Sequence, residues 1–219
     1  MRGKYTLHPE RRGKKGATVA LAVLAVLLAA VFVAGWMASR DPEEGRFESV
    51  KPDNTVARKV FLASFSGGES SFTAEEINGL LAEALSKYNE GKPVEKRVAA
   101  LAIAGVSGDC ADLYLRVPFH GKRFGVLLSG KPGVESGRLF FRVRSARVGS
   151  LPVPAGMLLN AGQSRFPDRF TAEENSIFCD APGIRASYGG VSGSVTVTGL
   201  KIQEGRFVVE SRAGLQITG

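Results

Sequence analysis

An uninterrupted apolar run from residue 17 to residue 37 constrains this chain more than any other feature. The run holds 21 residues with no charge, and Thr18 is its one polar side chain. As a helix it would extend for roughly 30 Å, which matches the hydrocarbon core of a bilayer. A helix in a globular core would carry one apolar stripe, whereas this run is apolar on all sides. We therefore expect residues 17–37 to form a transmembrane helix.

The flanks of the run predict its orientation. Residues 1–16 contain six Lys or Arg residues and a single acid, Glu10, and positive charge beside a spanning helix stays in the cytoplasm. Trp36 lies where an interfacial aromatic anchor is common. A cleaved signal peptide is the alternative, with Val33-Ala34-Gly35 as a weak cleavage site, but its apolar core would be only about 7 to 15 residues long. The favoured prediction is a single-pass protein of the cell membrane, with residues 1–16 cytoplasmic and residues 38–219 extracytoplasmic.

The net charge of the chain reflects this topology. Residues 1–16 contribute +5 of the formal net charge of +8, so +3 remains for all other residues. A basic pI that arises mainly from a cytoplasmic tail is no argument for nucleic-acid binding by the extracytoplasmic part. We expect the membrane as a partner and no nucleic acid.

The chain behind the run divides into a linker and one domain. Residues 38–55 are polar, contain proline and lack periodicity, which predicts a linker before a domain at residues 56–219. The clearest element of the domain is a helix that opens with Thr73 and Glu76 in capping-box spacing. Apolar side chains then follow at helical spacing, and the helix ends at Gly91. Such an amphipathic helix can bind a partner or a membrane surface, but packing on a sheet is the favoured interpretation.

Period-two alternation follows this helix and predicts antiparallel strands. In residues 111–119 the odd positions are apolar, and the returning segment places Phe124, Val126 and Leu128 on one face. Glu204-Gly205 predicts the turn of a closing hairpin. The expected strands are residues 56–65, 97–106, 111–119, 122–128, 138–148, 193–202 and 206–213.

Breaks separate the expected strands. Glycines predict a turn region at residues 130–137, and residues 149–154 should break the pairing because Pro152 and Pro154 cannot donate to a ladder. Residues 155–161 are expected to form a short helix. The fold class predicted is α+β, with a mostly antiparallel curved sheet and one packed amphipathic helix behind the transmembrane helix.

Residues 72–160 resemble a known family. They include the segments Phe72-Thr73-Ala74-Glu75-Glu76-Ile77-Asn78, Leu113 to Phe119 with Gly121, Gly137-Arg138-Leu139-Phe140 and Val148-Gly149-Ser150-Leu151-Pro152-Val153-Pro154. With its N-terminal anchor, the chain resembles the YpmS-like proteins, single-pass bacterial membrane proteins with an uncharacterised extracytoplasmic domain. The resemblance implies a curved sheet with a helix and no known enzymatic activity. It also implies a likeness to elongated lipid-binding modules, which is an analogy of fold alone.

No set of residues in the sequence points to catalysis, so we predict no enzyme and no cofactor. The chain has no G-x-S-x-G elbow and no phosphate-binding loop. His120, the single histidine outside the cytoplasmic tail, lies beside a turn and is interpreted as solvated. Metal binding is not predicted, because the chain has no C-x-x-C motif. Cys110 and Cys179 could form a disulfide in an extracytoplasmic location, and two separate buried thiols are the alternative.

Basic and apolar side chains supply two sets of candidate binding residues. Between Arg116 and Arg147 there are eight Lys or Arg residues and one acid. A solvated sheet face explains this pattern, and contact with phospholipid head groups or an acidic protein patch is the alternative. The candidates for contact with an anionic partner are Arg138, Arg142 and Arg144. The candidates for an apolar groove, each equally compatible with an ordinary core, are Leu115, Val117, Phe119, Phe124 and Val126.

Two functional hypotheses follow from these features. The favoured one is a membrane-anchored extracytoplasmic binding module whose curved sheet holds a lipid or another apolar envelope ligand. The alternative is a non-enzymatic scaffold or assembly protein that binds another envelope protein through a sheet edge or the helix. A hydrolase is disfavoured, because no catalytic set can be assembled.

Overall fold

The computed structural model describes residues 13–65, 68–165, 170–180, 184–188 and 191–215. The chain divides into two compact units, Met1–Met37 and Ala38–Gly219. Each unit is described by itself.

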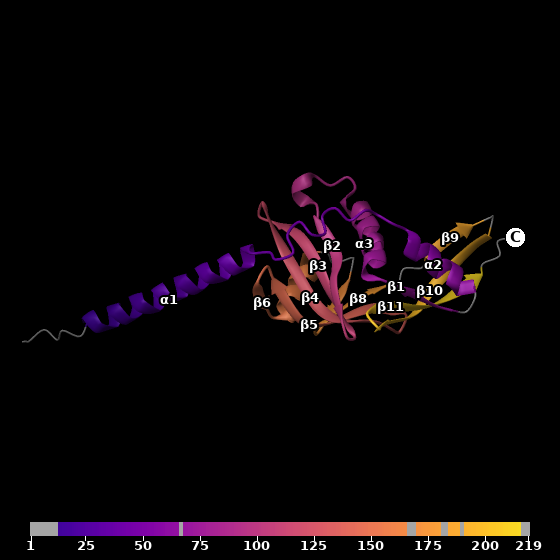
Figure 1. Cartoon of the computed structure of the whole chain (residues 1–219). Helices are drawn as coiled ribbons and strands as arrows, with labels where there is room; N and C mark the ends of the chain where they lie inside the picture. The colour runs from indigo at the N-terminus through magenta and orange to yellow at the C-terminus, as the bar shows by residue number, and fades with distance from the viewer. Residues whose placement is uncertain (1–12, 66–67, 166–169, 181–183, 189–190, 216–219) are drawn as a thin grey trace, which may run out of the picture. The chain divides into compact units, whose positions relative to one another are not determined.

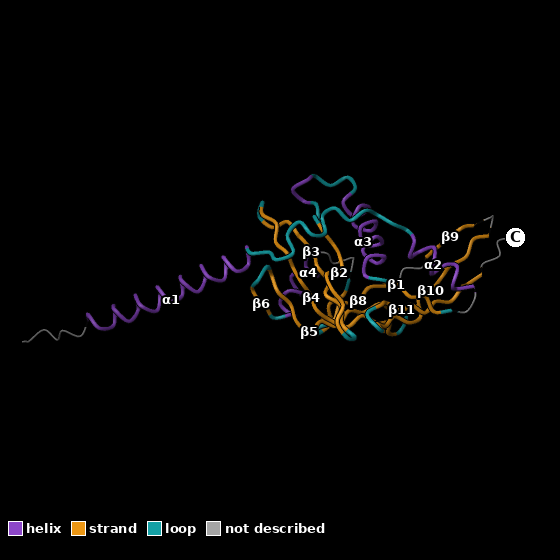
Figure 2. Tube along the Cα trace, in the orientation of Figure 1, coloured by secondary structure: helices purple, strands orange, loops and turns teal. Residues whose placement is uncertain are grey.

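The described part of the first unit belongs to helix α1 (Gly13–Ser39), which Figure 2 shows as one continuous helix. Its large apolar side chains are exposed at Leu24, Val26, Leu27, Leu28, Val31, Phe32, Val33 and Trp36. Within the described part of the chain, no helix combines the length and the apolar character that crossing a membrane requires. The transmembrane helix therefore stays a prediction from the sequence.

The second unit is built on two antiparallel sheets (Figure 1). The smaller sheet has the order β1-β11-β10-β9, with bounds Glu69–Phe72, Arg206–Leu215, Val191–Gln203 and Ile184–Tyr188. The larger sheet has the order β2-β3-β4-β5-β8-β7, and β6 also pairs with β5. Its strands are β2 (Ala100–Ser107), β3 (Cys110–Phe119), β4 (Lys122–Glu135), β5 (Arg138–Val148), β6 (Leu151–Val153), β7 (Thr171–Glu173) and β8 (Ser176–Asp180). The prediction of an α+β fold with mostly antiparallel pairing is confirmed.

Several turns and strand limits differ from the predictions. Strand β4 runs on to Glu135, and the turn is confined to Ser136 and Gly137, whose φ angles are 51° and 75°. The glycines before it serve close packing instead, since a side chain at Gly133 would collide with the ring of Phe140. The predicted break at 149–154 contains strand β6, which tolerates Pro152 because β6 pairs only with β5 among the described strands. The closing hairpin around Glu204-Gly205 is confirmed.

Helix α2 (Thr55–Phe65) replaces the strand predicted at residues 56–65. Its buried residues Val56, Val60 and Ser64 recur every four positions, which is the spacing of one helical face. The Asp53 carboxylate accepts bonds from the Thr55 amide at 2.9 Å and the Thr55 hydroxyl at 2.7 Å, at the start of the helix. The β-branched valines predicted a strand, but a helix is the conformation that buries all of them against the smaller sheet.

Helix α3 (Ala74–Asn89) opens with the predicted capping box. The Glu76 amide donates to Thr73 Oγ1 at 3.2 Å, and the Thr73 amide donates to Glu76 Oε2 at 2.9 Å. The helix lies beside β2 (Figure 1), and Ile77, Leu80 and Leu81 pack on a buried cluster around Phe72. The sequence therefore predicted both the start and the packing role of this helix.

Two asparagines of α3 bind the free edge of β2, the terminal strand of the larger sheet, and the backbone just before it. The side-chain amide of Asn78 donates from Nδ2 to the Ile103 carbonyl at 3.0 Å, and its Oδ1 accepts from the backbone amide of Ile103 at 2.6 Å. Asn89 makes the same pair of bonds with the backbone of Val98, at 2.8 and 3.1 Å. These side chains take the place of a neighbouring strand. An exposed edge is a template for unwanted pairing, and the asparagines block it here.

A second buried cluster lies under the larger sheet. It contains Leu128, Val143, Ala146 and Leu159. Leu159 comes from helix α4 (Ala155–Arg165), which confirms the predicted short helix and extends it.

Candidate functional site

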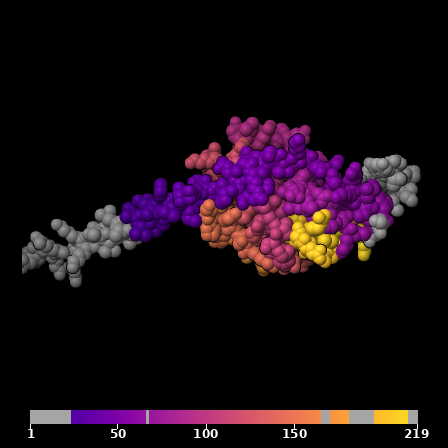
Figure 3. Space-filling model, in the orientation of Figure 1, coloured from indigo at the N-terminus to yellow at the C-terminus, as the bar shows by residue number. Residues whose placement is uncertain are grey.

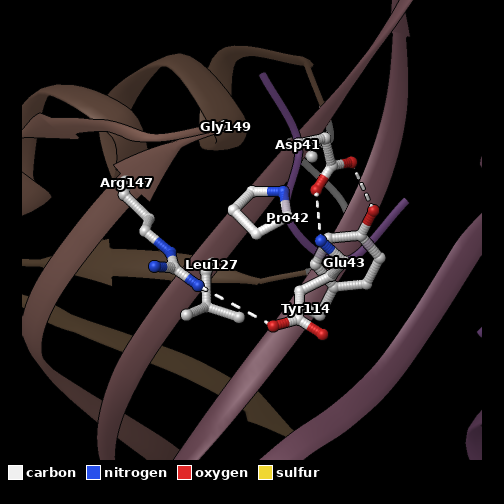
Figure 4. A pocket seen from close by; sticks show the side chains of 8 residues that line it. Asp41, Pro42, Glu43, Tyr114, Leu127, Arg147 and Gly149 are labelled. Carbon is white, nitrogen blue, oxygen red and sulfur yellow. Dashed lines mark hydrogen bonds and ion pairs between the residues drawn. The ribbon is translucent and has the colours of Figure 1, made fainter. Parts of the chain in front are cut away.

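Residues 40–53, which we call the strap, pack on the larger sheet. This segment lies within the range predicted as a linker, yet it makes specific contacts across a long sequence distance. Tyr114, which is 1% exposed, donates from its hydroxyl to Asp41 Oδ2 at 2.6 Å (Figure 4). Burial, together with this bond to a carboxylate, raises the pKa of Tyr114 well above its usual range. Phe47 packs against the ring of Tyr114 with 5.6 Å between centroids.

A glycine on β4 lets the strap approach this closely. A side chain at Gly125 would occupy the space of the Asp41 carboxylate. The neighbouring backbone is also engaged, because the Gly149 amide donates to the Gly125 carbonyl at 2.7 Å. The Ser150 hydroxyl donates to the Arg40 carbonyl at 3.1 Å and holds the start of the strap.

Ion pairs attach the acidic part of the strap to basic strands. Arg116 pairs with both Glu44 and Glu48, and Arg147 lies 3.9 Å from Glu43. Burial disfavours the charged guanidinium of Arg116, but its bond to Glu44 and the charges of Glu48 and Glu44 outweigh this effect and raise its pKa. Nε of Arg116 is buried without a hydrogen-bond partner among the described residues. Arg116 is therefore committed to the strap and is not available to an external anion.

The hollow between the start of the strap and the sheet is filled by its own side chains. Figure 4 shows Pro42 and Leu127 facing each other between Arg147 and Asp41. The space left for a water-sized molecule is about 0 Å³. This part of the strap is a packed contact, so it offers no binding cavity.

A groove with free volume lies further along the strap, beside α3. Its volume is about 180 Å³. Its lining comes from three elements, and it consists of Phe47, Glu48, Val50 and Pro52 of the strap, Ala82, Leu85, Ser86 and Asn89 of α3, and Ala99 and Leu101 at β2. Typical pockets for drug-sized ligands measure about 300 to 1,000 Å³. The groove is therefore smaller than a typical pocket for a complete small molecule.

The five residues predicted for an apolar groove lie elsewhere. Leu115 and Val126 pack against the second buried cluster. Val117 and Phe124 are cross-strand partners near the end of the β3–β4 hairpin, and Phe119 at its tip is 59% exposed. None of the five lines the groove beside α3.

The three arginines predicted to meet an anionic partner have contacts within the chain. Arg138 pairs with Glu173 at 3.4 Å, and Arg144 pairs with Asp109 at 3.2 Å. The guanidinium of Arg142 lies 5.3 Å from the centroid of the Phe140 ring. Ion pairing thus occupies two of the three, while Arg142 remains exposed.

Cys110 and Cys179 are both free thiols in the structure, as in the alternative of two separate thiols, but both are half-buried rather than buried. They lie on β3 and β8, and two strands, β4 and β5, separate these in the sheet. Neighbouring strands are about 4.8 Å apart, whereas a disulfide needs its two Cα atoms within about 7 Å. Burial raises the pKa of both thiols.

The residues that organise this site were not singled out from the sequence. The available signal was charge complementarity, because the acids of the strap are followed much later by an excess of basic residues at 116–147. That signal indicates that the two segments can attract each other, but not which side chains meet. No local sequence pattern predicts the groove, because its three walls come from segments that lie far apart in the sequence.

Comparison with models of known protein families, with curated proteins and with solved structures finds no match for this chain. The likeness to the YpmS-like proteins therefore stays a prediction from the quoted segments.

Proposed function

We propose that the chain is a membrane-anchored extracytoplasmic binding module that holds an acyl chain or a similar narrow apolar ligand in the groove beside α3. The observation that carries this proposal is the groove itself, where seven apolar and three polar residues from three segments line an open space of about 180 Å³. A lipid tail is narrow, flexible and apolar, so it matches this volume better than a compact metabolite does.

The anchor half of the proposal rests on the sequence of residues 17–37 and on their side chains. Eight large apolar side chains between Leu24 and Trp36 are at least half exposed. Each such side chain gains about 1.5 to 3 kcal/mol from complete burial in an apolar environment. A bilayer supplies that environment on all sides of the helix, and the basic tail favours a cytoplasmic N-terminus.

The strap supports a location of the domain close to the bilayer. Only residues 38 and 39 separate Met37, the end of the apolar run, from Arg40, whose carbonyl already accepts a bond from Ser150. Three residue steps span at most about 10 Å, even in extended chain. The domain is therefore held within reach of the membrane, where lipid ligands are available.

Photochemical labelling of the full-length chain tests this proposal. The chain is reconstituted in lipid nanodiscs with a fatty acid that carries a diazirine on its tail, irradiated, digested and analysed by mass spectrometry. We expect label on the peptides that contain residues 47–52 and 82–89, in addition to label on residues 17–37. Leu85→Trp fills the groove, so it should remove the label from the two groove peptides and leave the anchor label unchanged.

Leu62→Trp is the matched control, because Leu62 is 60% exposed on α2 and lies outside the groove lining. This variant should retain groove labelling. Label confined to residues 17–37 would refute the groove and keep the anchor, whereas no label on residues 17–37 would refute the anchor. A stoichiometric protein partner that is lost with Leu85→Trp would favour the scaffold alternative.

A further inference from the structure

The end of the β3–β4 hairpin projects beyond the rest of the larger sheet. Strand β2 begins at Ala100, which pairs with Arg116 of β3. Strand β5 ends at Val148, which pairs with Val126 of β4. Residues 117–124, which we call the finger, therefore pair only with each other among the described residues. A two-stranded projection of this kind has little core of its own.

The finger exposes an aromatic ring beside two cations. Phe119 is 59% exposed, with its ring centroid 6.2 Å from Phe124 and 4.5 Å from His120. Lys122 and Arg123 are exposed, and no ion pair between described residues uses either of them. This differs from Arg116, Arg138 and Arg144, whose charges are balanced by acids of the chain.

This combination suits the interface of an anionic bilayer. An aromatic ring gains free energy by entering the boundary between head groups and acyl chains, and Lys or Arg beside it attracts lipid phosphates. Packing within the finger does not explain Phe119, because more than half of its surface stays in water.

The finger also lies at the end of the domain where the chain enters. The strap starts at Arg40, whose carbonyl is bonded to Ser150, and Asp41 lies against Gly125. Lys122 is three residues before Gly125 on the same strand, which corresponds to about 10 Å. If residues 17–37 cross the membrane, as the proposed function requires, this end of the domain is the end near the lipid surface.

We propose that the finger is a membrane-contact element, in which Phe119 enters the interface of an anionic phospholipid bilayer and Lys122 and Arg123 bind the lipid phosphates. This inference rests on the membrane anchor of the proposed function and goes beyond the groove, which it does not involve. It predicts a second attachment of the domain to the bilayer, independent of the helix.

Tryptophan fluorescence of the full-length chain tests the inference. Trp36 is the single tryptophan of the chain, so Trp36→Phe provides a background for Phe119→Trp as the only emitter. The protein is reconstituted in vesicles of phosphatidylcholine with phosphatidylglycerol, with and without bromine on the acyl chains. We expect emission at shorter wavelength than in water and clear quenching by the brominated lipids, and both effects should weaken in phosphatidylcholine alone.

The matched control is Leu62→Trp in the same background. Leu62 is 60% exposed, as Phe119 is 59% exposed, but α2 packs on the smaller sheet away from the finger (Figure 1). Its tryptophan should emit as in water and remain unquenched. Lys122→Glu with Arg123→Glu should abolish the quenching at position 119, because each cation near an anionic surface strengthens binding about five-fold.

Two outcomes overturn the inference, and flotation of the vesicles distinguishes them. Equal quenching at positions 119 and 62, or none at 119, in a chain that floats with the vesicles refutes the finger and leaves the anchor intact. A chain that stays in the aqueous fraction refutes the anchor and removes the basis of the inference with it.

Discussion

The bond between Tyr114 and Asp41 should control how readily the strap opens. Tyr114→Phe removes one oxygen from a side chain that is 1% exposed, so the packing against Phe47 is retained while the 2.6 Å bond is lost. Hydrogen bonds to charged groups contribute about 1.5 to 3 kcal/mol. Asp41 keeps the hydrogen bond from the Glu43 amide at 3.1 Å. It is also only half-buried, so water can partly replace the hydrogen bond lost from Tyr114. We expect about 1.5 kcal/mol, or roughly a ten-fold larger opening equilibrium.

Hydrogen exchange of the full-length chain, followed by mass spectrometry, measures this effect. The amides of Glu43, Arg46 and Asp53 are bonded within the strap or to α3, so they should exchange about ten times faster in the variant. Amides of the β10–β11 hairpin should be unaffected, because this hairpin belongs to the smaller sheet.

A double-mutant cycle with Asp41→Asn tests the assigned cause. If the two side chains act through their shared bond, the second substitution should add little to the first. Additive effects, or unchanged exchange in the strap, would refute the reasoning. Equal acceleration in the β10–β11 hairpin would show that Tyr114 stabilises the whole domain instead.

Three further predictions concern other parts of the domain. Asn78→Ala leaves two buried backbone groups of β2 unpaired and should lower the free energy of unfolding by about 3 kcal/mol in urea titrations, whereas the exposed Asn160→Ala should change it by less than about 0.5 kcal/mol. Hydrogen bonds from Lys59 and from the backbone of Thr73 lower the pKa of Glu76 below its ordinary value of 4.5. The stability that Glu76 supplies is therefore complete above pH 4.5, and it is lost as the pH falls through the lowered pKa. Glu76→Gln should therefore flatten stability between about pH 5 and pH 3, and an unchanged profile would contradict this assignment. Cys110 and Cys179 should both react with a maleimide after denaturation without reductant, and a failure of either to react would contradict the free thiols.

Local signals in the sequence predicted much of the fold. The capping box at Thr73 and Glu76 involves residues three positions apart, so its geometry is written in a short segment. The β10–β11 hairpin is specified in the same way by alternation around Glu204-Gly205, where both residues adopt positive φ. Helix α2 was assigned wrongly because valines at four-residue spacing satisfy two patterns, and contact with the smaller sheet decides between them.

The strap and the groove could not be predicted by the same means. Asp41 and Tyr114 are separated by 73 residues, and the polar composition of the strap is equally typical of a solvated linker. Gly125 is informative only once its partner is known, because a glycine in a strand can indicate a bulge, a bend or a close approach. The basic stretch was recognised, but the acids that balance most of it lie at distant positions such as Glu44 and Asp109.

The walls of the groove are held in place by two different kinds of contact. Asn78 and Asn89 attach α3 to β2 and to Val98 just before it through four hydrogen bonds between neutral groups, so this wall should be insensitive to salt. The opposite wall is the strap, which lies at the surface of the domain (Figure 3) and is held by ion pairs of the exposed carboxylates Glu44 and Glu48. Exposed ion pairs weaken as ionic strength rises. We therefore expect a rise in ionic strength to loosen the groove at the strap and to leave the contact between α3 and β2 unchanged.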